Sequence, residues 1–221
     1  MKQKFTILFD LDGTLIDTAP DLIRAHNHVM KKFGYPTKKL GELKNAVGKG
    51  AKAMMAKANG QWKWFDEKIQ NEMTNEFLSY YGQNILHESK LINGVKEFLN
   101  WCKKENISMA VCTNKTEHLA VDLLKKIGIY DYFEYVAGYN TFEYCKPDPR
   151  HLTTIIEILD GDINKSIMIG DSETDANAAK AAEIPIILLK YGYTEKKSSE
   201  IYHNHLVKDF VGIEKIITEY L

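Results

Sequence analysis

Two carboxylates two residues apart, Asp10 and Asp12, are the first residues of this 221-residue chain whose types and spacing could do chemistry. They follow residues 5–9, an apolar run that predicts a short buried strand, and they precede Gly13. Open α/β sheets bind their ligands at the carboxyl ends of strands. An aspartate there could attack phosphorus, and a second could exchange protons with the leaving oxygen and with water. Gly13 would let the backbone turn tightly beside a phosphate. The alternative is a strand that ends in an Asx turn.

Two further polar segments follow later in the chain. Thr113 and Asn114 come directly after residues 107–112, which predict a strand. A hydroxyl group and backbone N–H groups at a strand-to-helix turn suit phosphate oxygens, although Thr113 could instead only cap the next helix. Lys146 opens the segment Lys-Pro-Asp-Pro before another predicted helix. Its ammonium could neutralise a phosphate and a nucleophile together. The alternative is a solvated lysine at a plain helix start.

A last acidic segment, Gly-Asp-Ser-Glu-Thr-Asp at 170–175, follows another short apolar run. Asp171 would face the same sheet edge as Asp10, and the two carboxylates with a backbone carbonyl offer ligands that Mg²⁺ accepts. Asp175, one helical turn further on, would support them. Acidic residues also favour a helix N-terminus without any metal. That alternative leaves these aspartates and Asp12 repelling one another unless a cation lies among them. Together the four segments predict metal-dependent phosphoryl transfer through an aspartyl-phosphate.

The elements that must position these residues alternate along most of the chain. From residue 91 onward, strand-like runs alternate with helical periodicity, which predicts a parallel sheet with helices on both faces. Residues 16–87 show helical periodicity throughout. We therefore predict an α/β, Rossmann-like core domain at 1–15 and 88–221 and an inserted all-helical cap domain at 16–87, with hinges near 16–18 and 87–90. The expected strands are 5–9, 107–112, 133–137, 166–169 and 184–189, and the expected helices are 18–33, 43–58, 62–81, 95–102, 119–127, 152–159, 176–182 and 208–220. The helix at 43–58 is expected to be broken near Gly48 and Gly50.

Composition narrows the class of protein. The net charge of -1 gives no electrostatic reason to expect nucleic acid as a partner. No apolar run is long enough to span a bilayer, and the first apolar run leads straight into an acidic pair, unlike a signal peptide. Cys102, Cys112 and Cys145 are odd in number and have no CxxC spacing, which indicates free thiols. We expect a cytoplasmic monomer or homodimer that acts on a small phosphorylated metabolite, with neither nucleic acid nor membrane as a partner.

The four segments together resemble the haloacid dehalogenase superfamily of phosphatases. The likeness covers the whole chain, and residues 16–87 match the helical cap that type-one members insert after their first motif. The matching motifs are Asp10-Leu-Asp-Gly-Thr, Thr113-Asn, Lys146-Pro-Asp-Pro and Gly170-Asp-x-x-x-Asp.

This resemblance implies a role for each matching residue. Asp10 would be the nucleophile and Asp12 the general acid and base. Asp12 also argues against the dehalogenase branch, which lacks a carboxylate there. The phosphate would be bound by Thr113 and Lys146, with Gly13 and Asn114 beside it. The cofactor Mg²⁺ would be bound by Asp10, Asp171 and the backbone carbonyl of Asp12, with Asp175 in support.

Within the superfamily the chain is most similar to phosphoglycolate phosphatases. The likeness lies in residues 9–22, in Val47-Gly-x-Gly at 47–50 and in Tyr-Gly-Tyr at 191–193. It implies a Mg²⁺-dependent phosphatase, with 2-phosphoglycolate as the first substrate to test. Lys49 departs from the expected pattern because a smaller polar residue is usual between the two glycines.

Several alternatives stay open on the sequence alone. A cationic cap residue such as Lys49, Lys52 or Arg24 could bind a substrate carboxylate, or it could be solvated. A sugar-phosphate mutase similar to β-phosphoglucomutase, a pyrophosphatase and a nucleotidase share most of the motifs. A response-regulator receiver also combines an acidic cluster, a hydroxyl and a lysine, but its phosphorylated aspartate lies in mid-chain and it has no helical insert.

Overall fold

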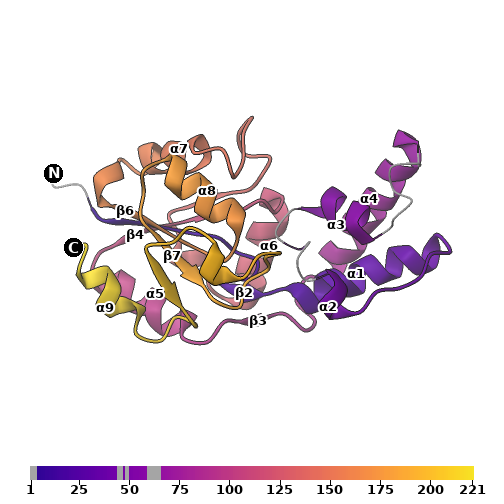
Figure 1. The fold of residues 1–221 in the computed structure, drawn as a ribbon, viewed down its shortest axis with the longest axis horizontal. Coiled ribbons are helices and arrows are strands. Elements are labelled where there is room, and N and C mark those ends of the chain that lie inside the picture. The colour runs from indigo at the N-terminus through magenta and orange to yellow at the C-terminus, as the bar shows by residue number, and fades with distance from the viewer. Residues whose placement is uncertain (1–3, 44–46, 48–49, 59–65) are drawn as a thin grey trace.

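The central element of the fold is a six-stranded sheet (Figure 1). Its strands follow the order β5-β4-β1-β6-β7-β8. The computed structural model describes residues 4–43, 47, 50–58 and 66–221. All neighbouring strands of this sheet pair in parallel. Its strands are β1 (Thr6–Phe9), β4 (Ser108–Cys112), β5 (Tyr135–Ala137), β6 (Ser166–Gly170), β7 (Ile186–Leu189) and β8 (His205–Val207).

Helices cover both faces of the sheet, because side chains along each strand point alternately to opposite faces. In β1, Ile7 and Phe9 belong to one buried cluster, which also contains residues of α5, α6 and α9. Leu8 belongs to the other, with residues of α7 and α8. These helices are α5 (Val95–Lys104), α6 (Glu117–Ile127), α7 (Arg150–Ile158), α8 (Glu173–Ala181) and α9 (Ile213–Thr218), with short 3-10 helices at Tyr130–Tyr132, Ile163–Lys165 and Ser198–Glu200. The predicted fold class is confirmed.

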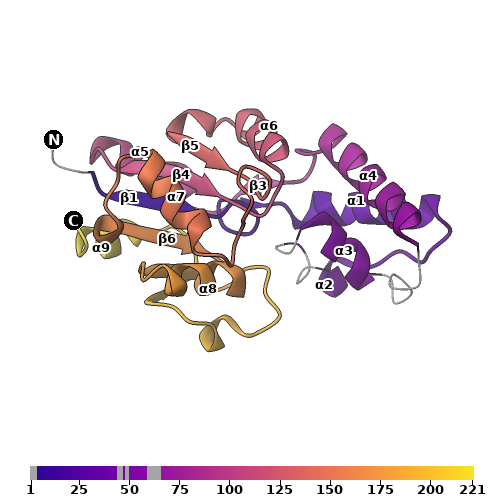
Figure 2. The ribbon, with the colours of Figure 1, turned by 90° about the horizontal axis from the view of Figure 1, so that it is seen from above.

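Within the described residues, four more helices lie together beyond the carboxyl edge of the sheet, at the end of the molecule opposite both termini (Figure 2). They are α1 (Ala19–Lys32), α2 (Leu40–Leu43), α3 (Ala51–Ala58) and α4 (Glu67–Gln83). We call residues 19–83 the helical cap. The chain enters it through β2 (Ile16–Asp17) and leaves through β3 (Lys90–Leu91), and these two strands pair antiparallel. No helix in the described ranges has the length and apolar character that a membrane crossing requires.

The structure differs from the sequence-based expectations at two places, the connections to the helical cap and the C-terminal helix. The two-residue strands β2 and β3 lie where the hinges are expected, but they are too short to show a periodicity. The region 43–58, expected as a helix broken near Gly48 and Gly50, agrees with the structure: it holds the end of α2 and all of α3, and Gly50 between them has a φ of 85°. The C-terminal helix begins only at Ile213, because Gly212 has a φ of 84° and the half-buried edge strand β8 precedes it.

Candidate active site

Three buried carboxylates meet at the carboxyl edge of the sheet. Phe9 of β1 pairs with Ile169 of β6, so Asp10 and Asp171 leave neighbouring strands at nearly the same height. Asp175 lies in the first turn of α8, directly after β6. One carboxylate oxygen from each of these aspartates lies within 4.8 Å of the other two. The strand ends therefore bring together residues that are up to 165 positions apart in the chain.

The ammonium of Lys146 lies between two of these carboxylates. Lys146 Nζ donates to Asp10 Oδ1 at 2.8 Å and to Asp175 Oδ1 at 2.6 Å. Burial lowers the pKa of Lys146, but Asp10 and Asp175 together raise it above its ordinary value, so the side chain stays charged. The site thus holds a buried cation directly against the proposed nucleophile.

One ammonium does not balance three carboxylates. Burial, opposed by Lys146 and reinforced by Asp175, raises the pKa of Asp10 from 3.8 to about 6. Burial, followed by the charges of Asp10 and Asp175, raises the pKa of Asp171 well above its ordinary value. Both directions mean that negative charge is costly here. Carboxylate oxygens are the ligands that Mg²⁺ prefers, so these residues fit a divalent cation.

The backbone approaches Asp171 closely, which explains two glycines. Gly13 has a φ of 86°, and a Cβ there would lie 2.4 Å from Asp171 Oδ2. A Cβ on Gly192 would lie 2.3 Å from Asp171 Cβ and 2.4 Å from its carbonyl oxygen. Asp171 is further held by hydrogen bonds from Thr14 Oγ1 at 3.1 Å and from the Tyr193 N–H at 2.6 Å. Its carboxylate is therefore fixed on several sides.

Asp12 lies outside this cluster and has its own partners. Its Oδ1 accepts from the Thr18 hydroxyl at 2.6 Å, and Lys115 Nζ lies 3.0 and 3.2 Å from its two oxygens. Lys115 Nζ also donates to the Tyr81 hydroxyl oxygen at 2.9 Å. Burial, and then the charge of Asp12, raise the pKa of Tyr81 well above its ordinary value, so the phenol stays neutral. The carboxylate proposed to move protons is thus linked through one lysine to helix α4 of the cap.

Thr113 and Asn114 continue from β4 and lie beside the same site. Thr113 is buried, and its hydroxyl oxygen accepts from the Lys115 N–H at 3.2 Å. Asn114 Nδ2 donates to the carbonyl of Lys146 at 2.8 Å. Asn114 Oδ1 is buried and has no hydrogen-bond partner among the described residues. Asn114 therefore helps to position Lys146 and has an acceptor left.

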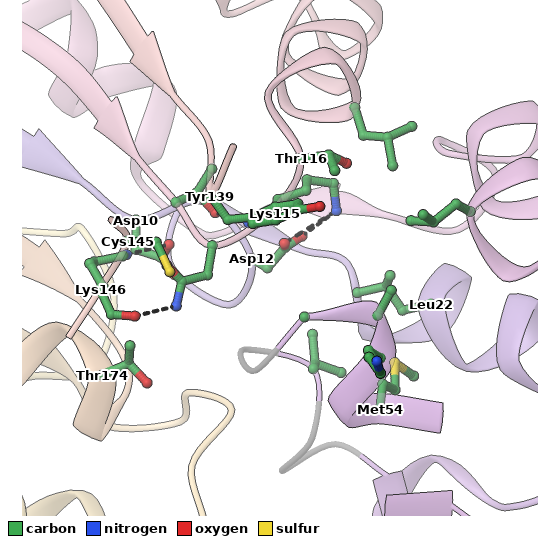
Figure 3. Close-up of a pocket in the computed structure, with 18 of the residues that line it drawn as sticks. Asp10, Asp12, Leu22, Met54, Lys115, Thr116, Tyr139, Cys145, Lys146 and Thr174 are labelled. Carbon is green, nitrogen blue, oxygen red and sulfur yellow. Dashed lines mark hydrogen bonds and ion pairs between the residues drawn. The ribbon is translucent and has the colours of Figure 1, made fainter. Parts of the chain in front are cut away.

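A cavity of about 370 Å³ opens between the sheet edge and the cap (Figure 3). Its floor carries Asp10, Asp12 and Lys146, and its walls include apolar residues of α1, α3 and α4. Most of the predicted site residues thus line one cavity of a size suited to a small metabolite. Gly13 and Asp171 are not among the residues that line this cavity.

Comparison with known proteins assigns the family. The family model described as haloacid dehalogenase-like hydrolase matches residues 7–189 of the chain. The chain belongs to this family. A phosphoglycolate phosphatase of Mesorhizobium japonicum is 36% identical over 97% of this chain and 95% of its own length. One of Agrobacterium fabrum is 37% identical over 97% and 92%. A crystal structure of a predicted phosphoglycolate phosphatase from Haemophilus somnus superposes with a TM-score of 0.91 at 28% identity, over 98% of this chain and 99% of the other.

The resemblance stated from the motifs is confirmed, and with it the enzyme class, a phosphoric monoester hydrolase. Other solved structures share the fold at lower identity. A β-phosphoglucomutase from Clostridium difficile has a TM-score of 0.80 at 20% identity, over 98% of this chain and 97% of its own. At that identity the likeness concerns the fold alone.

Three cationic cap residues were candidates for substrate binding in this haloacid dehalogenase-like hydrolase. Lys49 lies outside the described residues. Lys52 lines the cavity from α3. Arg24 does not line the cavity, and its guanidinium instead pairs with Asp21 and, at 2.9 Å, with Glu88.

Asp21, near the start of α1, binds the segment through which the chain leaves the helical cap. Its carboxylate accepts from the backbone N–H groups of residues 87, 88 and 89 and from the Ser89 hydroxyl. Burial alone would raise the pKa of Asp21, but the hydrogen bonds from Ser89 and the backbone hold it below its ordinary value. The start of α1 and the segment before β3 therefore form one hydrogen-bonded unit.

Sequence analysis gave Lys115, Tyr81 and Tyr193 no role at the site, and considered Thr18 only as the start of the helix expected at 18–33. Tyr193 is buried, and its hydroxyl group donates to Asp17 and accepts from the Ala19 N–H at 3.0 Å. The same residue's backbone N–H donates to Asp171, so Tyr193 connects β2 and the start of α1 with the acidic cluster. The position of Lys115, directly after Thr113 and Asn114, was the one available signal for its place at the site.

Proposed function

We propose that this protein is a Mg²⁺-dependent phosphatase that hydrolyses 2-phosphoglycolate through an aspartyl-phosphate. The observation that carries the proposal is the Asp10 carboxylate, buried at the edge of β1 against the Lys146 ammonium and beside Asp171 and Asp175. The names of the relatives at 36% and 37% identity support the choice of substrate.

In this proposal an oxygen of Asp10 attacks the phosphorus, and the bond between phosphorus and the ester oxygen breaks. Protonated Asp12 gives its proton to the departing oxygen and later takes a proton from water. This water attacks the phosphorus, the bond between phosphorus and the Asp10 oxygen breaks, and inorganic phosphate and the free Asp10 carboxylate result. Lys146, with Thr113 and Asn114, neutralises and orients the phosphoryl oxygens. Asp10, Asp171 and the backbone carbonyl of Asp12 would hold Mg²⁺, with Asp175 in support, and the metal would balance phosphate charge.

The proposed domain division assigns residues 16–87 to a cap that closes over the core at 1–15 and 88–221. The antiparallel pair β2 and β3 and the Asp21 hydrogen bonds support hinges at the two crossings. Closure would exclude water from the cavity and select the substrate.

The test is phosphate release over a panel of phosphoglycolate, sugar phosphates, nucleotides and pyrophosphate, with Mg²⁺ or Ca²⁺. We expect preference for phosphoglycolate, much lower rates with Ca²⁺ because it favours more ligands and looser geometry, and no turnover in Asp10→Asn. Asp122→Asn, an exposed change on α6, serves as the matched control and should behave as wild type. Turnover in Asp10→Asn would contradict the nucleophile assignment. Activity that needs a sugar bisphosphate and releases little phosphate would indicate a mutase instead.

A further inference from the structure

Lys115 occupies a position between the proton-exchanging carboxylate and the cap. It extends from the segment between β4 and α6, and it is 9% exposed. Its Nζ contacts both oxygens of Asp12 (Figure 3). It also donates to Tyr81 Oη and lies 4.4 Å from the centroid of the Tyr81 ring. A buried ammonium thus lies directly beside the carboxylate that the proposed reaction assigns to the leaving group.

The charge balance of Lys115 differs from that of Lys146. Lys146 contacts two carboxylates, Asp10 and Asp175. In the described part of the chain, the ion pairs of Lys115 involve one carboxylate, that of Asp12. The proposed reaction needs this carboxylate for the ester oxygen. An anionic group of the substrate that replaces Asp12 at the ammonium would therefore keep Lys115 neutralised while Asp12 turns to the reaction.

A second observation marks the same spot as a ligand site. Thr116, the next residue, lines the cavity, and its Oγ1 is buried without a hydrogen-bond partner among the described residues. Thr116 precedes α6, yet its side chain makes no capping hydrogen bond to that helix. A buried hydroxyl without a partner is costly. A carboxylate beside Lys115 would accept from this hydroxyl and from the ammonium.

The surroundings strengthen such an interaction. Leu22, Phe77 and Leu119 line the cavity together with Lys115 and Thr116. Apolar walls exclude water and make a charged hydrogen bond stronger than it is in solution.

We propose that Lys115, with Thr116, binds a carboxylate on the leaving group of the substrate and so selects short phosphorylated acids. The inference rests on the proposed phosphatase activity and names the residues that choose its substrate. Asp12, at the ester oxygen, is in direct contact with Lys115. A leaving group with one carbon between its ester oxygen and its carboxylate, as in glycolate, therefore suits this separation. Lys115, which would supply the charge that selects the substrate, lies next to Thr113 and Asn114 after β4. The helical cap contributes Tyr81, whose hydroxyl oxygen accepts from Lys115.

The test compares kcat/KM for phosphoglycolate with kcat/KM for its neutral amide, which has the same shape but no carboxylate charge. Wild type should prefer the acid. Lys115→Met should lower this preference by roughly 10- to 100-fold, the range for a hydrogen bond between charged groups. Thr116→Val should lower it less. Lys126→Met, on the exposed face of α6, is the matched control and should keep the preference. Lys115→Gln retains a donor for Asp12 without the charge, and gives the same test if the methionine variant does not fold.

Each outcome separates this inference from the proposed function. An unchanged preference in folded Lys115→Met or Lys115→Gln overturns the inference but leaves a phosphoglycolate phosphatase. An equal loss for acid and amide also overturns it, because Lys115 would then act only through Asp12. Loss of preference in Lys52→Met and not in Lys115→Met would assign selection to the cap and overturn it. If wild type hydrolyses neither compound, the proposed function itself fails.

Discussion

Asp10→Asn is expected to stabilise the metal-free protein at neutral pH, although it removes the proposed nucleophile. Asp10 is buried, and burial, opposed by Lys146 and reinforced by Asp175, raises the pKa of Asp10 from 3.8 to about 6. The folded protein therefore binds this proton more tightly than the unfolded chain does. The resulting stability is fully present below pH 4 and is lost as the pH rises through about 6.

The magnitude follows from the two pKa values. A tenfold difference in proton affinity corresponds to about 1.4 kcal/mol, so ionising Asp10 in the folded state costs about 3 kcal/mol. Asparagine has nearly the same shape, carries no charge, and keeps an oxygen that can accept from Lys146. The variant should therefore exceed wild type in unfolding free energy by about 3 kcal/mol at pH 7.5, and by progressively less toward pH 4.

The assay is urea unfolding of both proteins in a chelator between pH 4 and 8. Adding Mg²⁺ should stabilise wild type more than the variant, since the metal binds the folded state through this carboxylate. Asp122→Asn, which changes an exposed aspartate, should track wild type at every pH. A variant that follows the pH profile of wild type would refute the reasoning, because the Asp10 carboxylate would then carry no buried-charge penalty.

Three further substitutions probe the supports of the site. Lys146→Met leaves its buried carboxylates without their ammonium and should cost about 3–5 kcal/mol in urea unfolding and abolish phosphate release. Gly192→Ala places a Cβ 2.3 Å from Asp171 Cβ, so it should cost about 1–3 kcal/mol and raise the Mg²⁺ concentration needed for half-maximal activity. Tyr193→Phe loses the hydroxyl contacts to the hinge but keeps the N–H to Asp171. It should cost about 1 kcal/mol without changing that Mg²⁺ concentration, and a clear change would contradict this division of roles.

The polar segments of the site could be predicted because each follows an apolar run. In a parallel sheet the carboxyl ends of the strands share an edge, so strand-end positions alone bring Asp10, Thr113 and Asp171 together. The sheet could be predicted for the same reason, since strand-like runs and helical periods alternate from residue 91 onward. Local sequence patterns were sufficient to predict which residues meet wherever the position of a residue along its strand determines its spatial neighbours.

The remaining features depend on contacts that no local pattern encodes. Lys115 meets Asp12 across 103 positions of sequence, and its burial follows from the cap covering it. Thr18 lies where the first cap helix was expected to start, but its hydroxyl donates to Asp12 and makes no capping hydrogen bond to α1. Tyr193 lies in the segment between β7 and β8, and its hydroxyl reaches Asp17 of β2, which is 176 positions away in the chain. Such residues act through partners that only the fold supplies.

The most direct test of the central claim is acid quenching of the enzyme during turnover of ³²P-labelled phosphoglycolate with Mg²⁺, followed by peptide mapping. We predict label on the peptide that contains Asp10, released by hydroxylamine as expected for an acyl phosphate, and no label in Asp10→Asn. Phosphate release at an undiminished rate from Asp10→Asn, or label on a different residue, would contradict the account.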